Sequence, residues 1–199
     1  MRRMSSRLPI VLVVAACSAY GADLRYWIEP CTRPETACQK TDGELAEWAF
    51  QAWVKAAGGT LKLQKVDQAA SAHIRLHWAD AGQGQYGEAR PILVDGVRGA
   101  EVYVRPDVSA MGPDISSLAG KDVLLRDTIV YLTCLHETGH ALGLSHTADF
   151  PDIMYSFGFG GDIPEYFGRY RRNLKTRADI AKNSGISPQD KARLIQVLK

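Results

Sequence analysis

The segment HETGHALGLSH, residues 136–146, constrains more than any other what this chain can fold into. It holds three of the five histidines of the chain. Positions i and i+4 of a helix lie on one face about one turn apart, so His136 and His140 can both point at a single ion. Gly143 lets the chain leave the helix in a backbone conformation that is costly for other residues. His146 can then swing back as a third ligand, which predicts a metal site at the end of a helix.

The glutamate beside the first histidine gives this predicted site its chemistry. Three neutral imidazoles are typical of Zn²⁺ with a fourth position open for water, and an open position indicates a catalytic rather than a structural ion. Glu137 lies one step round the helix, where it does not easily share the ligand role but can reach a water on the ion. We therefore expect Glu137 to act as the general base that takes the water's proton and hands it to a leaving amine. This pattern predicts peptide-bond hydrolysis without a covalent intermediate.

The same residues resemble a known family signature. Five positions of the segment resemble the metzincin signature: His136, Glu137, His140, Gly143 and His146. Met154, eight residues after the last of them, resembles the methionine of the family's Met-turn. The stretches HETGHALGLSHT, DIMYS and SPQDKARLIQVLK resemble the matrixin branch of these proteins, the matrix-metalloproteinase-like enzymes. The resemblance covers most of the chain after residue 22 in element order. It implies a zinc endopeptidase that acts on protein or peptide substrates.

The resemblance also implies roles for the surrounding residues. Met154 would form a hydrophobic floor beneath the metal. The strand around 88–93 would pair with an extended substrate, as edge strands can. The segment after Met154 would wall the pocket for the residue that follows the cut. The chain has Thr147 where matrixins usually have serine, and Ser156 where related families carry a zinc-reaching tyrosine, so Tyr155 is not expected to be a ligand.

Hydrophobic patterns along the chain predict an α+β fold, with a mixed twisted sheet of about five strands, two long helices and a C-terminal helix. Alternation of apolar and polar residues predicts five strands, at 24–30, 60–67, 72–80, 88–94 and 99–106. Helical spacing and capping residues predict helices at 42–59, 121–143 and 187–199. The segment 151–185 is rich in glycine, aromatic and basic residues and is interpreted mostly as loop.

The first residues are typical of a targeting segment rather than of the fold. Three arginines, a short apolar run over 8–16 and small residues thereafter predict a secretory signal at 1–21, followed by one matrixin-like peptidase domain at 22–199. Two ways of processing this signal stay open: ordinary cleavage near 19–22, or processing as a lipoprotein signal in which Cys17 carries the lipid. We expect a secreted or cell-envelope protein, either periplasmic or lipid-anchored. It would meet a membrane only if lipidated at Cys17.

The charge and the cysteine content indicate which classes of partner and which cellular compartment to expect. The predicted signal holds three of the 24 bases and none of the 22 acids, which leaves 21 bases against 22 acids. A nearly neutral domain gives no reason to expect nucleic-acid binding, and we expect a monomer. In an exported chain, Cys31 and Cys38 are expected to form a short disulfide, and Cys134 to be a small buried residue. The four tryptophans, Trp27, Trp48, Trp53 and Trp78, are expected to pack in the core and sheet.

Other candidate sites are weaker. The remaining histidines, His73 and His77, are interpreted as exposed or core residues rather than as ligands of a second zinc. The glycine-rich loop at 82–87 could hold calcium with acids nearby in sequence, at Asp80, Glu88, Glu101 and Asp107. A group of bases is expected to form a solvated loop face: Arg169, Arg171, Arg172, Lys175 and Arg177. The alternative function is a catalytically idle, zinc-holding lipoprotein that grips peptides at the cell surface.

Overall fold

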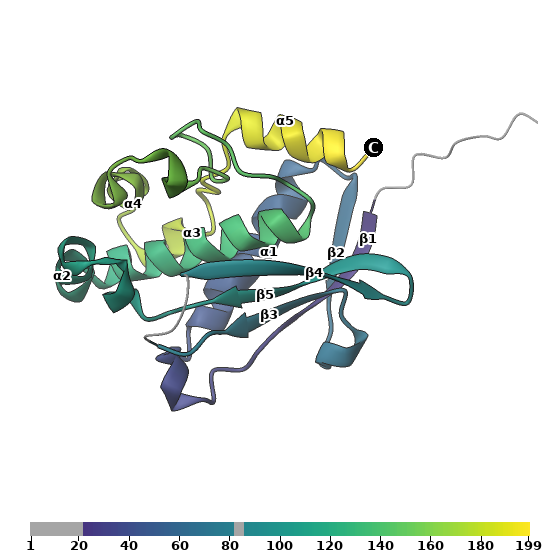
Figure 1. Ribbon diagram of the computed structural model, residues 1–199, viewed down its shortest axis with the longest axis horizontal. Helices are drawn as coiled ribbons and strands as arrows, with labels where there is room; N and C mark the ends of the chain where they lie inside the picture. Colours follow the sequence, from purple (N-terminus) through teal and green to yellow (C-terminus); the bar gives the residue numbers. More distant parts are fainter. Residues whose placement is uncertain (1–21, 82–85) are drawn as a thin grey trace, which may run out of the picture.

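One five-stranded mixed sheet organises the protein (Figure 1). The computed structural model describes residues 22–81 and 86–199. Its strands are β1 (Ala22–Ile28), β2 (Leu61–Lys65), β3 (Ile74–Trp78), β4 (Gly87–Val94) and β5 (Val97–Val104), in the order β2-β1-β3-β5-β4. β1 runs parallel to β2 and β3, β3 runs parallel to β5, and only β4 is antiparallel to its neighbour. The predicted α+β class and the five-stranded mixed sheet are confirmed.

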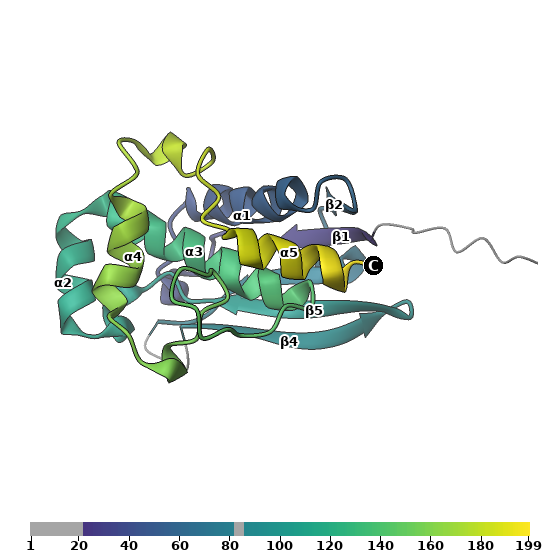
Figure 2. The ribbon, with the colours of Figure 1, turned by 90° about the horizontal axis from the view of Figure 1, so that it is seen from above.

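Two long helices pack together on one face of this sheet. α1 (Asp42–Ala56) and α3 (Val123–Ala141) contact each other along their length, and α3 also lies over β4 and β5 (Figure 2). The buried indole of Trp53 donates to the Leu135 carbonyl at 2.9 Å and so joins the two helices. At the start of α1, Asp42 forms a buried ion pair with Arg126 of α3. None of the helices within the described residues combines the length and apolar character needed to span a membrane.

The β4–β5 hairpin supplies a free strand to the sheet edge. Its turn, Asp95-Gly96, has positive φ at both positions, as a tight two-residue hairpin requires. The Arg105 N–H donates to the Tyr86 carbonyl, so these two residues form a hydrogen-bonded pair. In an antiparallel ladder such pairs alternate with pairs that form no hydrogen bond to each other. The backbone groups of residues 87, 89 and 91 therefore face the free edge, where the missing N–H of a proline at 91 costs no ladder hydrogen bond.

The prediction that 151–185 is mostly loop is wrong over α4 (Ile163–Arg171), and α2 (Pro113–Lys121) was not predicted at all. The Asp162 carboxylate caps α4 by accepting from the Glu165 N–H, and a proline occupies the first turn. Tyr166 and Tyr170, four residues apart, are buried on its inner face. Burial of these rings stabilises a helix in a segment whose overall composition is typical of loops.

The prediction that the bases between 169 and 177 form a solvated face is wrong for three of them, which contact other parts of the fold. The Arg171 guanidinium donates to Asp122 at 2.9 Å, and Arg177 donates to Asp127 at the same distance. Arg169 lies over the ring of Tyr166, 4.5 Å from its centroid. Arg171 therefore attaches α4, and Arg177 the segment after it, to the first turns of α3, although Arg172 and Lys175 are exposed as expected.

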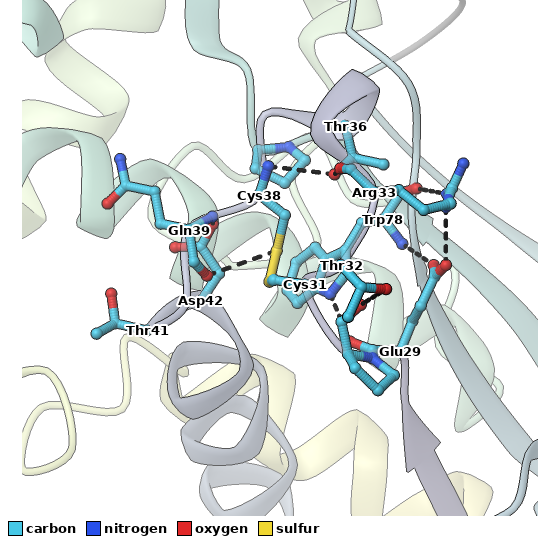
Figure 3. Close-up of a disulfide and its surroundings, with 12 residues drawn as sticks. Glu29, Cys31, Thr32, Arg33, Thr36, Cys38, Gln39, Thr41, Asp42 and Trp78 are labelled. Atoms are coloured by element: carbon cyan, nitrogen blue, oxygen red, sulfur yellow. Dashed lines mark hydrogen bonds and ion pairs between the residues drawn. A yellow bond between two sulfur atoms is a disulfide. The ribbon is translucent and has the colours of Figure 1, made fainter.

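The predicted disulfide between Cys31 and Cys38 is present and closes the loop between β1 and α1 (Figure 3). Asp42 lies beside it and accepts from the Gln39 N–H at 2.8 Å. Cys134 is free and buried, as expected. Trp53 and Trp78 are fully buried, whereas Trp27 and Trp48 are half-buried against the sheet and α1. The predicted signal at 1–21, including Cys17, and residues 82–85 of the glycine-rich loop lie outside the described residues.

Candidate metal centre

The last turns of α3 and the segment after it bring three histidines together. His136 and His140 lie on one face of α3, which ends at Ala141, and Gly143 follows with a φ of 100°. The chain then turns back at His146. The Nε2 atoms of the three rings are 3.2 Å apart between His136 and His146, and 3.1 Å apart in each of the other two pairs. The arrangement matches the one predicted from the spacing.

Backbone carbonyls fix the orientation of two of these rings. His136 Nδ1 lies 2.6 Å from the Ile153 carbonyl, and His140 Nδ1 lies 2.8 Å from the Leu144 carbonyl. A carbonyl oxygen only accepts, so each Nδ1 carries the proton and each Nε2 presents a lone pair to the centre. Burial, with the neighbouring histidines, lowers the pKa of His136 to about 3, and burial also lowers the pKa of His140. Both rings are therefore neutral at neutral pH.

This arrangement fits a zinc ion. The three Nε2 atoms lie 3.1–3.2 Å from one another, so a single point can lie about 2.0–2.1 Å from all three nitrogens, which is the distance at which zinc binds imidazole. Within residues 22–81 and 86–199, one other group brings three such ligand types together, Cys31, Cys38 and Asp42. Its two sulfurs are joined in the disulfide and offer no thiolate. The three histidines thus form a possible metal site.

Glu137 lies beside this centre, under the edge strand. Its side chain is 7% exposed, and a Cβ added to Gly87 of β4 would lie 2.4 Å from its Oε1. Burial, with a further effect of the charge on Glu88, raises the pKa of Glu137 to about 8. A divalent cation nearby favours the ionised form of a carboxyl group and so opposes that shift. The glycine at 87 thus leaves the space that the carboxyl group occupies.

Two hollows meet at Gly87, Glu137 and His146. One, of about 380 Å³, follows β4 from Gly87 to Pro91. The other, of about 420 Å³, is mainly apolar and is walled by the segment after Met154 together with α3, α4 and the turn before α2; its large side chains include Met111, Leu132, Tyr155, Phe157, Tyr166 and Phe167. The sequence predicted the wall after Met154 but missed the contribution of α4.

Met154 is fully buried directly beneath α3. A Cβ added to Gly139, next to His140, would lie 2.5 Å from its sulfur, so helix and methionine are in close contact. The neighbouring Tyr155 hydroxyl donates to the Gly160 carbonyl at 2.7 Å. That hydrogen bond gives the hydroxyl a partner outside the histidine cluster, in agreement with the expectation that Tyr155 is not a ligand.

The weaker candidates have partners of their own. His73 Nδ1 accepts from the Arg25 N–H at 2.9 Å, and His77 Nε2 lies 2.5 Å from Glu101. The acids named for calcium form other pairs: Asp80 with Arg33, Glu88 with Arg90, Glu101 with Arg75, and Asp107 with Ser109. Calcium in the glycine-rich loop stays a prediction, because residues 82–85 are not described.

A mixed sheet with a histidine-bearing helix across it, closed below by a buried methionine, is the architecture of the metzincins. The matrixin family matches residues 20–159, and the chain belongs to that family. Membership supports a zinc metallopeptidase and implies a catalytic zinc ion. A comparison with curated proteins found no match. The family match ends before α4 and α5 (Pro188–Val197).

Proposed function

We propose that this protein is a zinc-dependent endopeptidase, with zinc held by His136, His140 and His146 and with Glu137 as the general base. One observation carries the proposal. The Nε2 atoms of three imidazoles lie 3.1–3.2 Å apart, where the two hollows that Glu137 and His146 both line meet. The idle peptide-binding alternative is less well supported, because the carboxyl group that hydrolysis requires is present and borders the cleft.

Zinc bound there would supply Lewis-acid chemistry, polarising a substrate carbonyl and acidifying water. The chain's own groups then have defined tasks. The Ile153 and Leu144 carbonyls hold the first two ligand rings in orientation and in the tautomer that leaves Nε2 unprotonated. Glu137 takes a proton from the attacking water as its oxygen bonds to the carbonyl carbon, and delivers it to the amine nitrogen as the C–N bond breaks. The second proton of the water also passes to the amine, so the products are a carboxylate and an ammonium group.

The edge strand provides the binding surface for an extended peptide. The backbone groups of Gly87 and Ala89 face the free edge beside the site, where they can pair with substrate. Pro91 offers only its carbonyl there, so two-way pairing stops at this residue. The side chain that follows the cut would enter the apolar hollow behind His136.

We further propose that the protein acts outside the cytoplasm, as a monomer. The basic and apolar character of residues 1–21 supports export, and a disulfide is typical of oxidising compartments. Whether the signal is cleaved near 19–22 or Cys17 is lipidated stays open.

Cleavage of a quenched-fluorescent peptide library tests the proposed activity. We expect cleavage by the zinc-loaded protein, its loss on chelation and its return when zinc is added back. Glu137→Gln should retain zinc but lose cleavage, because the amide cannot accept the proton. Zinc binding without cleavage of any peptide would favour the idle binding module instead.

A further inference from the structure

His146 differs from the other two histidines in what holds its ring. His136 and His140 each donate from Nδ1 to a backbone carbonyl. In the described part of the chain, no hydrogen bond reaches Nδ1 of His146, and this residue is the exposed member of the three. Its position as a ligand therefore depends on the backbone that carries it.

That backbone is held at the next residue, Thr147. The Thr147 N–H donates to the Met154 carbonyl at 2.9 Å, and its carbonyl accepts from the Ser156 N–H at 3.1 Å. Its hydroxyl donates to Asp152 Oδ2 at 3.0 Å. Three hydrogen bonds thus fix the residue that directly follows the third histidine.

Asp152 connects this residue to the C-terminal helix. The Asp152 side chain is buried, and its other oxygen accepts from the Ser187 hydroxyl at 2.5 Å. Arg193 of α5 contacts the same Oδ2 that Thr147 contacts. Ser187 also caps α5, so the carboxylate lies where the helix begins. An element beyond the family match is thereby joined to the residue that follows a metal ligand.

The same helix also supports the first histidine. Arg193 bridges to Asp190 at 2.9 Å, and Asp190 Oδ2 accepts from the Ile153 N–H at 2.7 Å. The carbonyl of Ile153 is the acceptor for His136 Nδ1. Two routes therefore lead from α5 to the metal centre, one ending at Thr147 next to His146 and the other at the Ile153 carbonyl that accepts from His136.

We propose that Thr147 and Asp152 are positioning residues for the third zinc ligand. The hydroxyl–carboxylate hydrogen bond, anchored by Arg193 and Ser187, substitutes for the ring hydrogen bond that His146 lacks. This inference rests on the proposed zinc function. It assigns to Thr147 a role that requires its hydroxyl group, which serine would also supply, and not its methyl group.

Zinc affinity of matched variants tests this role directly. Thr147→Val removes the hydroxyl at nearly constant shape, whereas Thr147→Ser retains it. Thr128→Val is a control on α3, since the buried Thr128 hydroxyl has no partner among the described residues. We expect competition with a chromophoric chelator to show zinc binding weakened roughly 10- to 100-fold in Thr147→Val and Asp152→Asn. Thr147→Ser and Thr128→Val should stay within about twofold of the unmodified protein.

The visible spectrum of the cobalt-substituted protein provides a second readout that does not depend on activity. Thr147→Val should alter the intensity of the ligand-field bands, and Thr147→Ser should not. Unchanged zinc affinity and cobalt spectrum in a folded Thr147→Val protein would overturn the inference, even if Asp152→Asn fails to fold. His146→Ala separates the two proposals. If that variant binds zinc normally, the proposed ligand set is wrong and the positioning role fails with it.

Discussion

Replacement of Gly87 by alanine should disable the protein without removing its metal. The added methyl group would lie 2.4 Å from Oε1 of Glu137, whereas ordinary van der Waals contact begins at 3.4 Å. The three nearest atoms all belong to Glu137, so the whole carboxyl end must move by about 1 Å. A misplacement of that size costs about 10²-fold in rate, or about 2.7 kcal/mol of transition-state stabilisation. Gly87 has strand backbone, which alanine adopts without strain.

The assay is kcat/KM on a fluorogenic peptide together with zinc affinity for the same preparation. We expect a loss of about 100-fold in kcat/KM with zinc affinity unchanged. Gly43→Ala is the matched control, because a Cβ there meets nothing within 4 Å. More than half of the original activity in Gly87→Ala would refute the assignment of Glu137 as the base in this position. Loss of zinc would show that Gly87 acts through the metal ligands instead.

Three further predictions concern the stability of the fold. Burial, with the charge of Arg25, lowers the pKa of His73, so the unfolded chain binds more protons below about pH 6.5 and the free energy of unfolding falls there. In metal-free His73→Asn the side-chain oxygen can still accept from the Arg25 N–H. Urea titrations at several pH values should show that the free energy of unfolding of this variant falls less below about pH 6.5 than that of the unmodified protein. An identical pH dependence in the two proteins would contradict this prediction. Gly99→Ala should cost about 3 kcal/mol or more, because its Cβ would lie 1.9 Å from the backbone oxygen of His73; a loss under about 1 kcal/mol would show that the strands separate easily. Replacing Cys31 and Cys38 by serine should lower the free energy of unfolding by about 2–3 kcal/mol, as loop-closure entropy predicts for so short a loop, and an unchanged denaturation midpoint would contradict that.

The metal centre could be predicted because its geometry is local. Two histidines one helical turn apart and a glycine that ends the helix determine most of it within one segment, 136–146. The individual strands were predictable for the same reason, since alternation is read residue by residue. Their order in the sheet was not, because the pairing of β1 with β3 and of β3 with β5 depends on contacts between segments that are not adjacent in the chain.

Most of the missed features depend on long-range partners. Arg177 forms ion pairs with Glu44 and Asp127, which lie far from it in sequence, and no local pattern signals such contacts. The hydrogen bond from Thr147 to Asp152 is local, but its anchor at Arg193 is not. For α4 a local signal did exist, an aspartate three residues before Glu165 with a proline between them, and the aromatic and basic composition around it obscured that signal.

The most direct test of the central claim is a titration of the metal-free protein with zinc while peptide cleavage is followed. If His136, His140 and His146 hold the ion on which hydrolysis depends, cleavage should rise linearly and stop rising at one equivalent. His146→Ala should show no such break. Cleavage that needs no zinc, or one equivalent of bound zinc with no cleavage, would contradict the account.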